Sequence, residues 1–227
     1  MTEYDKALME FLLPMVNENR LALIDRLLKD RTRYITVLLE DIYQPHNASA
    51  VLRTCDCFGI QDVHIVENRN SYELNPEVEL GAAQWLTLHH YNKETNNTEK
   101  AIHSLKEQGY RIIAATPHTD DVKLADLDLE KGRLAIMLGT EMTGLTEKAM
   151  DLADEFVKIP MVGFTESFNI SVSAAIILYE LNKKLRASDI QWNLKPAEKE
   201  EIRYHWIKNS VNHISRIEQG FKKKYHC

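Results

Sequence analysis

Apolar residues recur along the chain in two spacings, and each spacing predicts one kind of element. Five short runs rich in aliphatic and β-branched residues have the length and composition of buried strands. They cover residues 34–39, 62–66, 111–115, 134–138 and 156–159. Because most residues of these runs are apolar, the runs are typical of strands that are covered on both faces of a parallel sheet.

Between the strands, apolar residues at helical spacing predict helices. These helices cover residues 48–58, 98–108, 147–153 and 169–186. Asn47 stands where the N-cap of the first helix belongs, and Gly59 stands just after its end. The alternation of strands and helices predicts an α/β fold with a mainly parallel sheet and helices on both faces.

Both ends of the chain are predicted to be helical extensions of this core. Helical spacing runs through residues 3–30, with a break at 17–19, and again through 197–224 after a polar linker. We therefore divide the chain into an N-terminal extension, an α/β domain, and a C-terminal linker with a helix: 1–33, 34–186 and 187–227.

Composition excludes several classes of protein. No run of 18 apolar residues is present, and the acidic N-terminus lacks the pattern of a signal peptide, so we expect no membrane span and a cytoplasmic location. Cys55 and Cys57 form the one close cysteine pair, and no second Cys/His pair follows at zinc-site spacing. We expect reduced thiols and no metal.

Charge is unevenly distributed along the chain. The net charge of −6 argues against a nucleic-acid partner at first sight. However, residues 36–186 carry 23 acids and 14 bases, for −9, whereas residues 195–227 carry eight bases and four acids, for +4. A basic tail on an acidic body indicates either a surface that binds polyanions or the solvated face of an amphipathic helix.

Polar residues and glycines follow three of the predicted strands, at the edge where parallel sheets bind ligands. After the first strand, Asn47 and Arg53 lie nearly two turns apart on one helix. Ala50 shares the face of Arg53 and leaves space beside its guanidinium group. Taken alone, this pattern also fits a helix cap followed by a surface arginine.

The second cluster follows the strand 134–138 and reads Gly139-Thr-Glu-Met-Thr-Gly144. The two glycines indicate close approach of the backbone to a ligand. Leu145 occupies the place of the phosphate-binding lysine of a P-loop, and the sequence contains no G-x-G-x-x-G. These absences disfavour a nucleotide-binding oxidoreductase.

The third cluster comprises Ile159-Pro160-Met161 and then Ser167-Phe168-Asn169-Ile170-Ser171. Its hydroxyl and amide groups stand at the start of a helix, where free backbone N–H groups and the positive end of the helix dipole are also available. One helix cap requires fewer polar residues than this cluster contains.

In order and spacing, the three clusters resemble the three motifs of the SpoU/TrmH methyltransferases across residues 34–186. The strings QPHNASAVLRT and SFNISVSAAIILYE are similar to the tRNA-modifying branch in particular. The resemblance implies a deep trefoil knot in the C-terminal part of the α/β domain, a homodimer, and S-adenosyl-L-methionine (AdoMet) bound within the knot. The sequence pattern alone would not predict a knot, because knots are nearly absent from protein folds.

The resemblance also implies roles for single residues. Arg53 is the catalytic residue, and Asn47 and Glu141 orient it and the substrate. Ser167 and Asn169 shape the wall of the cofactor site. Positions that contact the cofactor are Thr116, Gly139, Ile159, Met161 and Phe168. Arginine stays protonated in proteins, so Arg53 acts either as an unusual base or as a cation that binds phosphate and stabilises alkoxide charge.

The substrate implied by the resemblance is a ribose 2'-hydroxyl in RNA, and helical extensions at both ends favour a guanosine in the D-loop of tRNA. Three alternatives stay open: 23S ribosomal RNA, another tRNA position, and an RNA-binding protein of this fold without activity. Basic residues of the two extensions are expected to contact RNA phosphates. These are Arg31, Arg33, Arg203, Arg216, Lys222, Lys223 and Lys224.

Overall fold

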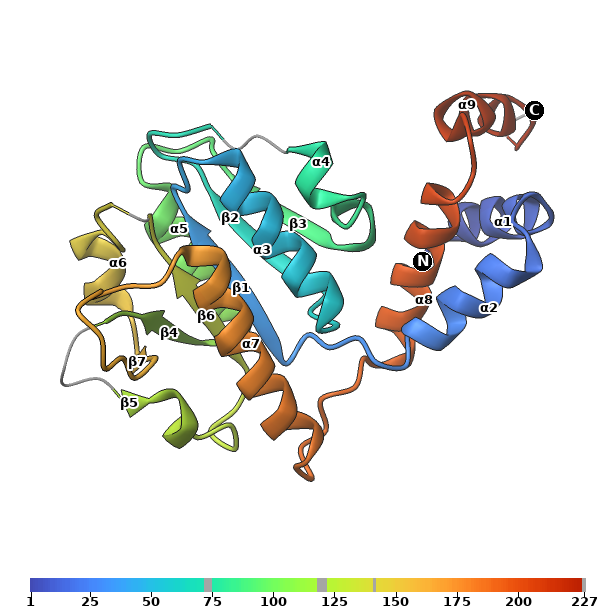
Figure 1. The fold of residues 1–227 in the computed structure, drawn as a ribbon. Helices are drawn as coiled ribbons and strands as arrows, with labels where there is room; N and C mark the ends of the chain where they lie inside the picture. Colours follow the sequence, from blue (N-terminus) through green and yellow to red (C-terminus); the bar gives the residue numbers. More distant parts are fainter. Residues whose placement is uncertain (72–74, 118–121, 141, 226–227) are drawn as a thin grey trace. The chain divides into compact units, whose positions relative to one another are not determined.

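Seven parallel strands form one sheet in a computed structural model that describes residues 1–71, 75–117, 122–140 and 142–225. The strand order is β3-β2-β1-β6-β4-β7-β5 (Figure 1). The strands are β1 (Ile35–Glu40), β2 (Asp62–Val66), β3 (Thr87–Tyr91), β4 (Arg111–Ala115), β5 (Val122–Lys123), β6 (Leu134–Leu138) and β7 (Glu155–Lys158). Every residue of β1, β2 and β6 is buried, which confirms the predicted parallel sheet with both faces covered.

Helices cover the two faces in pairs. On one face, α3 (Pro45–Cys57) packs against α7 (Ile170–Arg186), and both lie on the near side of the sheet in Figure 1. On the other face, α5 (Asn97–Glu107) packs against α6 (Glu147–Leu152). Successive side chains of a strand point to opposite faces, so each pair of helices closes its own apolar core.

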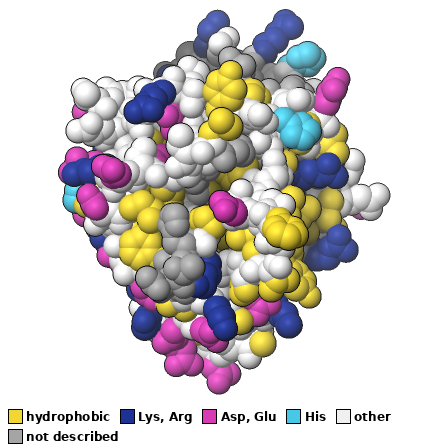
Figure 2. All heavy atoms as spheres, turned by 60° about the vertical axis from the view of Figure 1, so that its left-hand side comes forward, with side chains coloured by type: hydrophobic (Ala, Val, Ile, Leu, Met, Phe, Trp, Pro, Cys, Tyr) yellow, Lys and Arg dark blue, Asp and Glu magenta, His cyan; other side chains and the backbone are white. Residues whose placement is uncertain are grey.

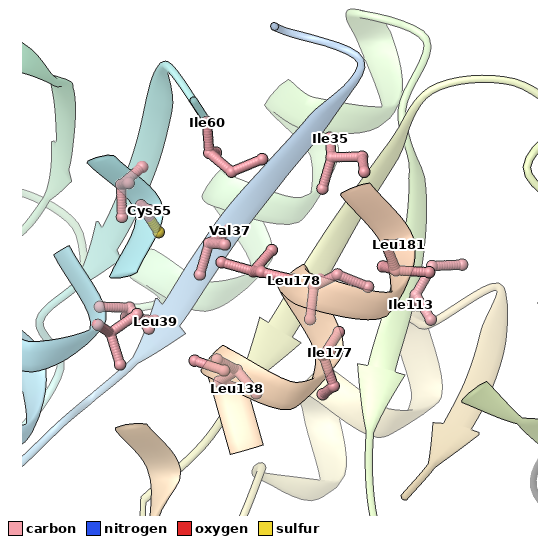
Figure 3. Close-up of a cluster of buried hydrophobic side chains, with 14 of the residues drawn as sticks. Ile35, Val37, Leu39, Cys55, Ile60, Ile113, Leu138, Ile177, Leu178 and Leu181 are labelled. Atoms are coloured by element: carbon pink, nitrogen blue, oxygen red, sulfur yellow. The ribbon is translucent and has the colours of Figure 1, made fainter. Parts of the chain in front are cut away.

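Neighbouring residues of β1 belong to different cores. Val37 packs with Ile177 and Leu178 of α7 in the core drawn in Figure 3. Leu38 packs on the opposite face with Ile102 of α5 and Met137 of β6. Each of these side chains is at most 1 % exposed, so truncation of a leucine, isoleucine or methionine among them to alanine would cost about 2–5 kcal/mol of stability.

Among the strands and α-helices of the described residues, three short ones were not predicted, because their sequences lack an apolar pattern. The strand β3, with the sequence TLHHY, lies at one edge of the sheet and is only half-buried. At the opposite edge, β5 has only two residues. The helix α4 (Pro76–Glu79) is a single turn. Edge strands are covered less than central ones, so their sequences carry a weaker apolar signal.

The predicted start of α3 at residue 48, with Asn47 as its N-cap, is wrong. The helix begins at Pro45, and Gln44 is the N-cap residue. Proline suits the first position of a helix because its missing N–H would have no partner there. Asn47 is therefore buried inside the first turn, where its side chain is available for contacts with other elements.

Four α-helices form a second unit from the two ends of the chain, Met1–Arg31 and Asn193–Cys227, while Thr32–Trp192 form the unit with the sheet. The helices are α1 (Glu3–Leu12), α2 (Glu18–Leu27), α8 (Pro196–Asn209) and α9 (Ile214–Tyr225), and the short 3₁₀ turn Leu13–Met15 follows α1. Trp206 of α8 is buried, as are Leu8 and Leu12 of α1. In the part of the chain that the structure describes, no helix is both long and apolar enough to cross a membrane.

The single helix predicted over 197–224 is wrong, because the chain leaves the helical path between α8 and α9. Ser210 ends α8, and its hydroxyl donates to the carbonyl oxygen of Trp206 at 2.8 Å. His213 then adopts a left-handed backbone with φ of 56°. This conformation is incompatible with a continuing α-helix.

A cluster of polar side chains spans β2 and β3 in the unit with the sheet. The buried carboxylate of Asp62 accepts from Arg33 Nε at 2.8 Å and lies 3.1 Å from His89 Nε2. His64 stacks on His89 with ring centroids 4.5 Å apart, and its Nδ1 lies 3.0 Å from the hydroxyl of Tyr91. Burial, aided by the nearby charge of His89, lowers the pKa of His64 to about 3. His64 is therefore neutral at neutral pH.

The buried His64 predicts a loss of stability in mild acid. Between its unfolded pKa of 6.5 and its folded pKa of about 3, the unfolded chain binds a proton that the folded chain excludes. Stability must then fall as pH falls through this window. Between pH 7.5 and 5.5, we expect the wild type to lose about 1 kcal/mol more unfolding free energy than His64→Gln, as measured by urea titration. Equal losses in the two proteins would show that His64 does not carry this dependence.

Candidate active site

A pocket of about 330 Å³ lies at the carboxyl ends of β4, β6 and β7. Three segments that follow these strands form its walls together with the first turns of α7: residues 115–117, 138–144 and 159–168. Its volume is within the range of small-molecule sites. Parallel sheets bind ligands at this edge, because the loops that follow neighbouring strands converge there.

Most of the predicted cofactor positions meet in this pocket, although they come from three separate parts of the sequence. Its lining residues include Thr116, Gly139, Ile159, Met161, Ser167 and Phe168. Asn169, the seventh predicted position, is the N-cap of α7 and directly follows the lining residue Phe168. The structure thus brings together residues that lie as far apart in the chain as Thr116 and Phe168.

The loop after β6 closes on itself as a small hairpin. The N–H of Thr140 donates to the carbonyl oxygen of Gly144 at 3.1 Å, and the N–H of Gly144 donates back at 3.0 Å. A Cβ on Gly139 would lie 2.3 Å from the Gly144 backbone, and Gly144 itself has a left-handed φ of 69°. The close backbone approach predicted at Gly139 is therefore made within the loop itself. Glu141 lies outside the described residues.

Two asparagines join the first and third motifs. The side-chain amide of Asn169 donates to Asn47 Oδ1 at 3.1 Å, and the amide of Asn47 donates to Gln44 Oε1 at 3.1 Å. Asn169 Oδ1 also accepts from the backbone N–H of Ser171 at 2.9 Å, which caps α7. These bonds fix the start of α3, the helix that carries Arg53, against the residue that follows Phe168 in the pocket wall.

Arg53 is exposed on α3. Across the described ranges, 1–71, 75–117, 122–140 and 142–225, no side chain makes a hydrogen bond or an ion pair with its guanidinium group. An unpaired guanidinium group on a rigid helix is available to an anion, and its planar fork suits phosphate in particular.

Large apolar side chains are exposed in two of the segments that form the pocket wall. Met142 of the hairpin is 94 % exposed, and Val162 and Phe164 of the segment after β7 are fully exposed. Figure 2 shows the side of the molecule on which β7 and α6 lie, where hydrophobic side chains gather across the middle. Exposed apolar surface of this kind is typical of binding or interaction surfaces.

Sequence reasoning missed two acidic residues at the carboxyl end of β1. Glu40 is 1 % exposed, and its carboxylate accepts hydrogen bonds from Thr98 and Thr146. Asp41 has a left-handed φ of 57°, and its carboxylate accepts from the backbone N–H groups of residues 68–70. The available signal was the pair of acids directly after a buried apolar run, because a buried carboxylate requires hydrogen-bond donors.

Three of the seven basic residues predicted to contact RNA are engaged within the protein. Arg31 is only 4 % exposed, and its guanidinium carbon lies 4.9 Å from the ring centroid of Trp206. Arg33 pairs with Asp62, and Arg203 pairs with Asp25 at 2.6 Å. The remaining four are exposed on α9: Arg216, Lys222, Lys223 and Lys224.

A comparison with protein families identifies the class of this fold and site. The SpoU rRNA Methylase family matches residues 34–179, which contain the whole sheet and the pocket. The match defines an α/β methyltransferase. The chain belongs to the SpoU methylase family, and the family resemblance of its three motifs is thereby confirmed.

Curated relatives match most of the chain. The tRNA (guanosine(18)-2'-O)-methyltransferase of Borreliella burgdorferi is 41% identical over 203 residues, covering 89% of this chain and 91% of the relative. The enzyme of the same name from Thermus thermophilus is 35% identical, covering 74% and 84%. That of Escherichia coli is 33% identical, covering 74% and 72%.

Solved structures share the fold. The A. aeolicus TrmH/SpoU tRNA modifying enzyme has a TM-score of 0.76 at 24% identity, covering 86% of this chain and 98% of that one. The SpoU methyltransferase AviRb from Streptomyces viridochromogenes, in complex with AdoMet, has a TM-score of 0.60 at 21% identity, covering 72% and 65%. These matches establish the α/β architecture independently of sequence identity.

Proposed function

We propose that this methyltransferase transfers a methyl group from AdoMet to the ribose 2'-hydroxyl of guanosine 18 in the D-loop of tRNA, in the cytoplasm. The observation that carries the proposal is the pocket lined by positions of the second and third motifs, beside which Asn47 of the first motif is hydrogen-bonded to Asn169. Relatives named for this reaction at 33–41% identity support the substrate.

The pocket residues fit AdoMet by their chemistry. Leu138, Ile159 and Phe168 supply apolar surface for a flat adenine ring, and Thr116 and Ser167 supply hydroxyl groups for the ribose. The carboxylate of Glu166, also in the lining, suits the positive charge of the methionine portion. When bound, AdoMet supplies the methyl group on a sulfonium, which makes it electrophilic.

Arg53 is the group best suited to hold the RNA backbone beside this pocket. Its exposed guanidinium can bind a phosphate next to the target ribose in a bidentate manner. From there it either accepts the hydroxyl proton or, as a cation, stabilises the developing alkoxide. The side-chain bond between Asn47 and Asn169 keeps the helix of Arg53 in place relative to the pocket wall.

Arg53→Ala should retain the fold and AdoMet binding but lose methyl transfer. Arg53 makes no side-chain bond in the described structure and does not line the pocket, so neither stability nor cofactor affinity depends on it. Transfer of labelled methyl from tritiated AdoMet to tRNA should fall by more than about tenfold, or ~1.4 kcal/mol of transition-state stabilisation. Arg53→Lys, which keeps the charge but loses the fork, should recover part of the rate. Activity of Arg53→Ala within tenfold of the wild type would reject the assignment.

The same assay distinguishes the substrates. The family description names rRNA, whereas the relatives at 33–41% identity are named for tRNA. Total tRNA and ribosomal RNA are offered separately, and the labelled nucleotide is then mapped. Label in rRNA alone or at another tRNA position would overturn the guanosine 18 proposal, and no label in any RNA would indicate a protein without activity.

The trefoil knot is part of the proposal and is supported by how the chain crosses the sheet. Between α6 on one face and α7 on the other, the chain forms β7, which pairs with both β4 and β5. Since β4 and β5 are consecutive in the chain, β7 lies in the sheet between two strands that precede it. Near the end of α7, Lys184 donates to the carbonyl oxygens of Ala125 and Leu127 at 2.7 Å each, which holds the segment after β5 against the helix. An experimental chain trace tests the threading directly.

A homodimer is likewise proposed, on the basis of the apolar surface of α7. Val172 is 44 % exposed and Tyr179 is 57 % exposed, although the opposite face of the helix already fills the core. Burial of these side chains against a second copy would remove this surface from water.

Light scattering should therefore report the mass of a dimer at assay concentration. Val172→Glu should shift the mass toward the monomer, because the interface would have to bury an unpaired charge. Glu180→Gln, a change on the same helix at a half-buried polar position, serves as the control and should leave the mass unchanged. A fully active monomer of the wild type would contradict the dimer.

RNA is proposed to be held by the basic end of the chain. The four exposed bases of α9, Arg216 with Lys222–Lys224, belong to the segment of net charge +4. The half-buried apolar residues of the same helix, such as Ile214, Ile217 and Phe221, show that packing and RNA binding can occupy different faces.

Replacement of Lys222, Lys223 and Lys224 by glutamine should weaken tRNA binding and flatten its salt dependence. For every lysine that binds a phosphate in the wild type, the slope of log affinity against log salt should decrease by about one. Fluorescence anisotropy with labelled tRNA measures both quantities. A control variant with the same net charge replaces three other exposed lysines, Lys6, Lys29 and Lys93. An equal effect in the control would assign the weaker binding to overall charge rather than to α9, and AdoMet affinity should stay unchanged in both.

A further inference from the structure

We infer that Glu40 is a positioning residue that fixes the cofactor-side hairpin, residues 139–140 and 142–146, to the central strand β1. The inference rests on the proposed function, since it assigns the pocket wall to AdoMet. Glu40 lies outside all three motif clusters and does not line the pocket. It acts through the residues that it holds.

The carboxylate of Glu40 is buried, and both of its oxygens accept hydrogen bonds. Oε1 accepts from the hydroxyl of Thr98 at 2.6 Å and from the hydroxyl of Thr146 at 2.8 Å, and Oε2 accepts from the backbone N–H of Thr146 at 2.9 Å. The side chains that donate are neutral, and no basic side chain within the described ranges pairs with Glu40. Burial of a carboxylate is unfavourable unless hydrogen-bond donors satisfy it, so the loss of any of the three bonds would be costly.

These bonds complete the attachment of the hairpin at both of its ends. At the first end, Leu138 of β6 is paired in register with Leu39 of β1, and Gly139 follows. At the second end, Thr146 is held by Glu40, the residue after Leu39. One dipeptide of β1 therefore anchors both ends of the segment that contributes Gly139, Thr140, Met142, Thr143 and Gly144 to the pocket.

The shape of the hairpin does not depend on Glu40, but its position does. The bonds between Thr140 and Gly144, and the bond from the N–H of Thr143 to the Thr140 hydroxyl at 3.1 Å, lie within the hairpin. In Glu40→Ala, the backbone N–H and the hydroxyl of Thr146 both lose their acceptor. The hairpin would then keep its internal bonds without its second anchor, which moves the wall of the pocket. A glutamine would not test this, because its amide oxygen could still accept from the N–H while its amide nitrogen donates to the two threonine hydroxyls.

Asp41 provides a matched control. It is buried like Glu40, it is the next residue of the chain, and its carboxylate also accepts three hydrogen bonds, at 3.0, 2.8 and 2.9 Å. Its donors are the backbone N–H groups of Asn68, Arg69 and Asn70, and none of these residues lines the pocket. Asp41→Ala therefore removes the acceptor of three hydrogen bonds, as Glu40→Ala does, without releasing the hairpin.

Isothermal titration of AdoMet against the full chain tests the inference. In Glu40→Ala we expect the Kd and the KM for AdoMet to rise about tenfold or more, while kcat at saturating AdoMet stays within about threefold of the wild type. In Asp41→Ala both constants should change by less than about threefold, even if the two variants lose similar thermal stability. A purely structural role of Glu40 would not produce this difference between the variants.

Every other outcome counts against the inference. Unchanged AdoMet affinity in Glu40→Ala, or an equal loss in Asp41→Ala, overturns the positioning role and leaves the proposed function intact. A wild-type chain that does not bind AdoMet instead removes the proposed function itself. If Glu40→Ala does not fold, Thr146→Val and Thr146→Ser replace it. The serine variant keeps the hydroxyl that bonds Glu40 and should bind AdoMet normally, the valine variant should bind it weakly, and equal affinities would reject the inference.

Discussion

The parallel pairing of β1 with β6 is the interaction on which the rest of the site depends. Five residue pairs, from Ile35↔Leu134 to Leu39↔Leu138, align the two strands so that they end at the same level. Glu40 and Gly139, the next residues of the two strands, therefore emerge side by side. A slip of this register by one residue would exchange the two faces of a strand and separate the carboxylate from Thr146.

The site itself is built where three chain segments converge, and two short polar links hold them. The amide pair Asn47–Asn169 joins α3 to α7, and the carboxylate of Glu40 joins β1 to the start of α6. Asn47 and Glu40, one partner in each link, are buried, where hydrogen bonds are strong and an unmade bond is costly.

Charged residues divide into those that stabilise the protein and those that remain available to a polyanion. Arg31, Arg33 and Arg203 stack on an aromatic ring or pair with a carboxylate. Arg53 and the basic residues of α9 are exposed. A net charge of −6 is therefore compatible with RNA binding, because attraction depends on where the exposed cations lie and less on their sum.

The sequence by itself determined the central strands, the four main helices around them and the positions that line the pocket. The continuous apolar run 134–138 and the helical spacing of apolar residues in 170–186 indicate, from each segment alone, which of its residues are buried. Only the tertiary structure decided the edge strands β3 and β5, the start of α3 at Pro45 and the break before His213. It also decided that Gly139 lies close to the backbone of Gly144 in its own hairpin, that Arg33 pairs with Asp62, and that Glu40 accepts a hydrogen bond from Thr146. The reason is physical: periodicity along the chain shows that a residue is buried, whereas the identity of its partner depends on segments that are distant in the sequence.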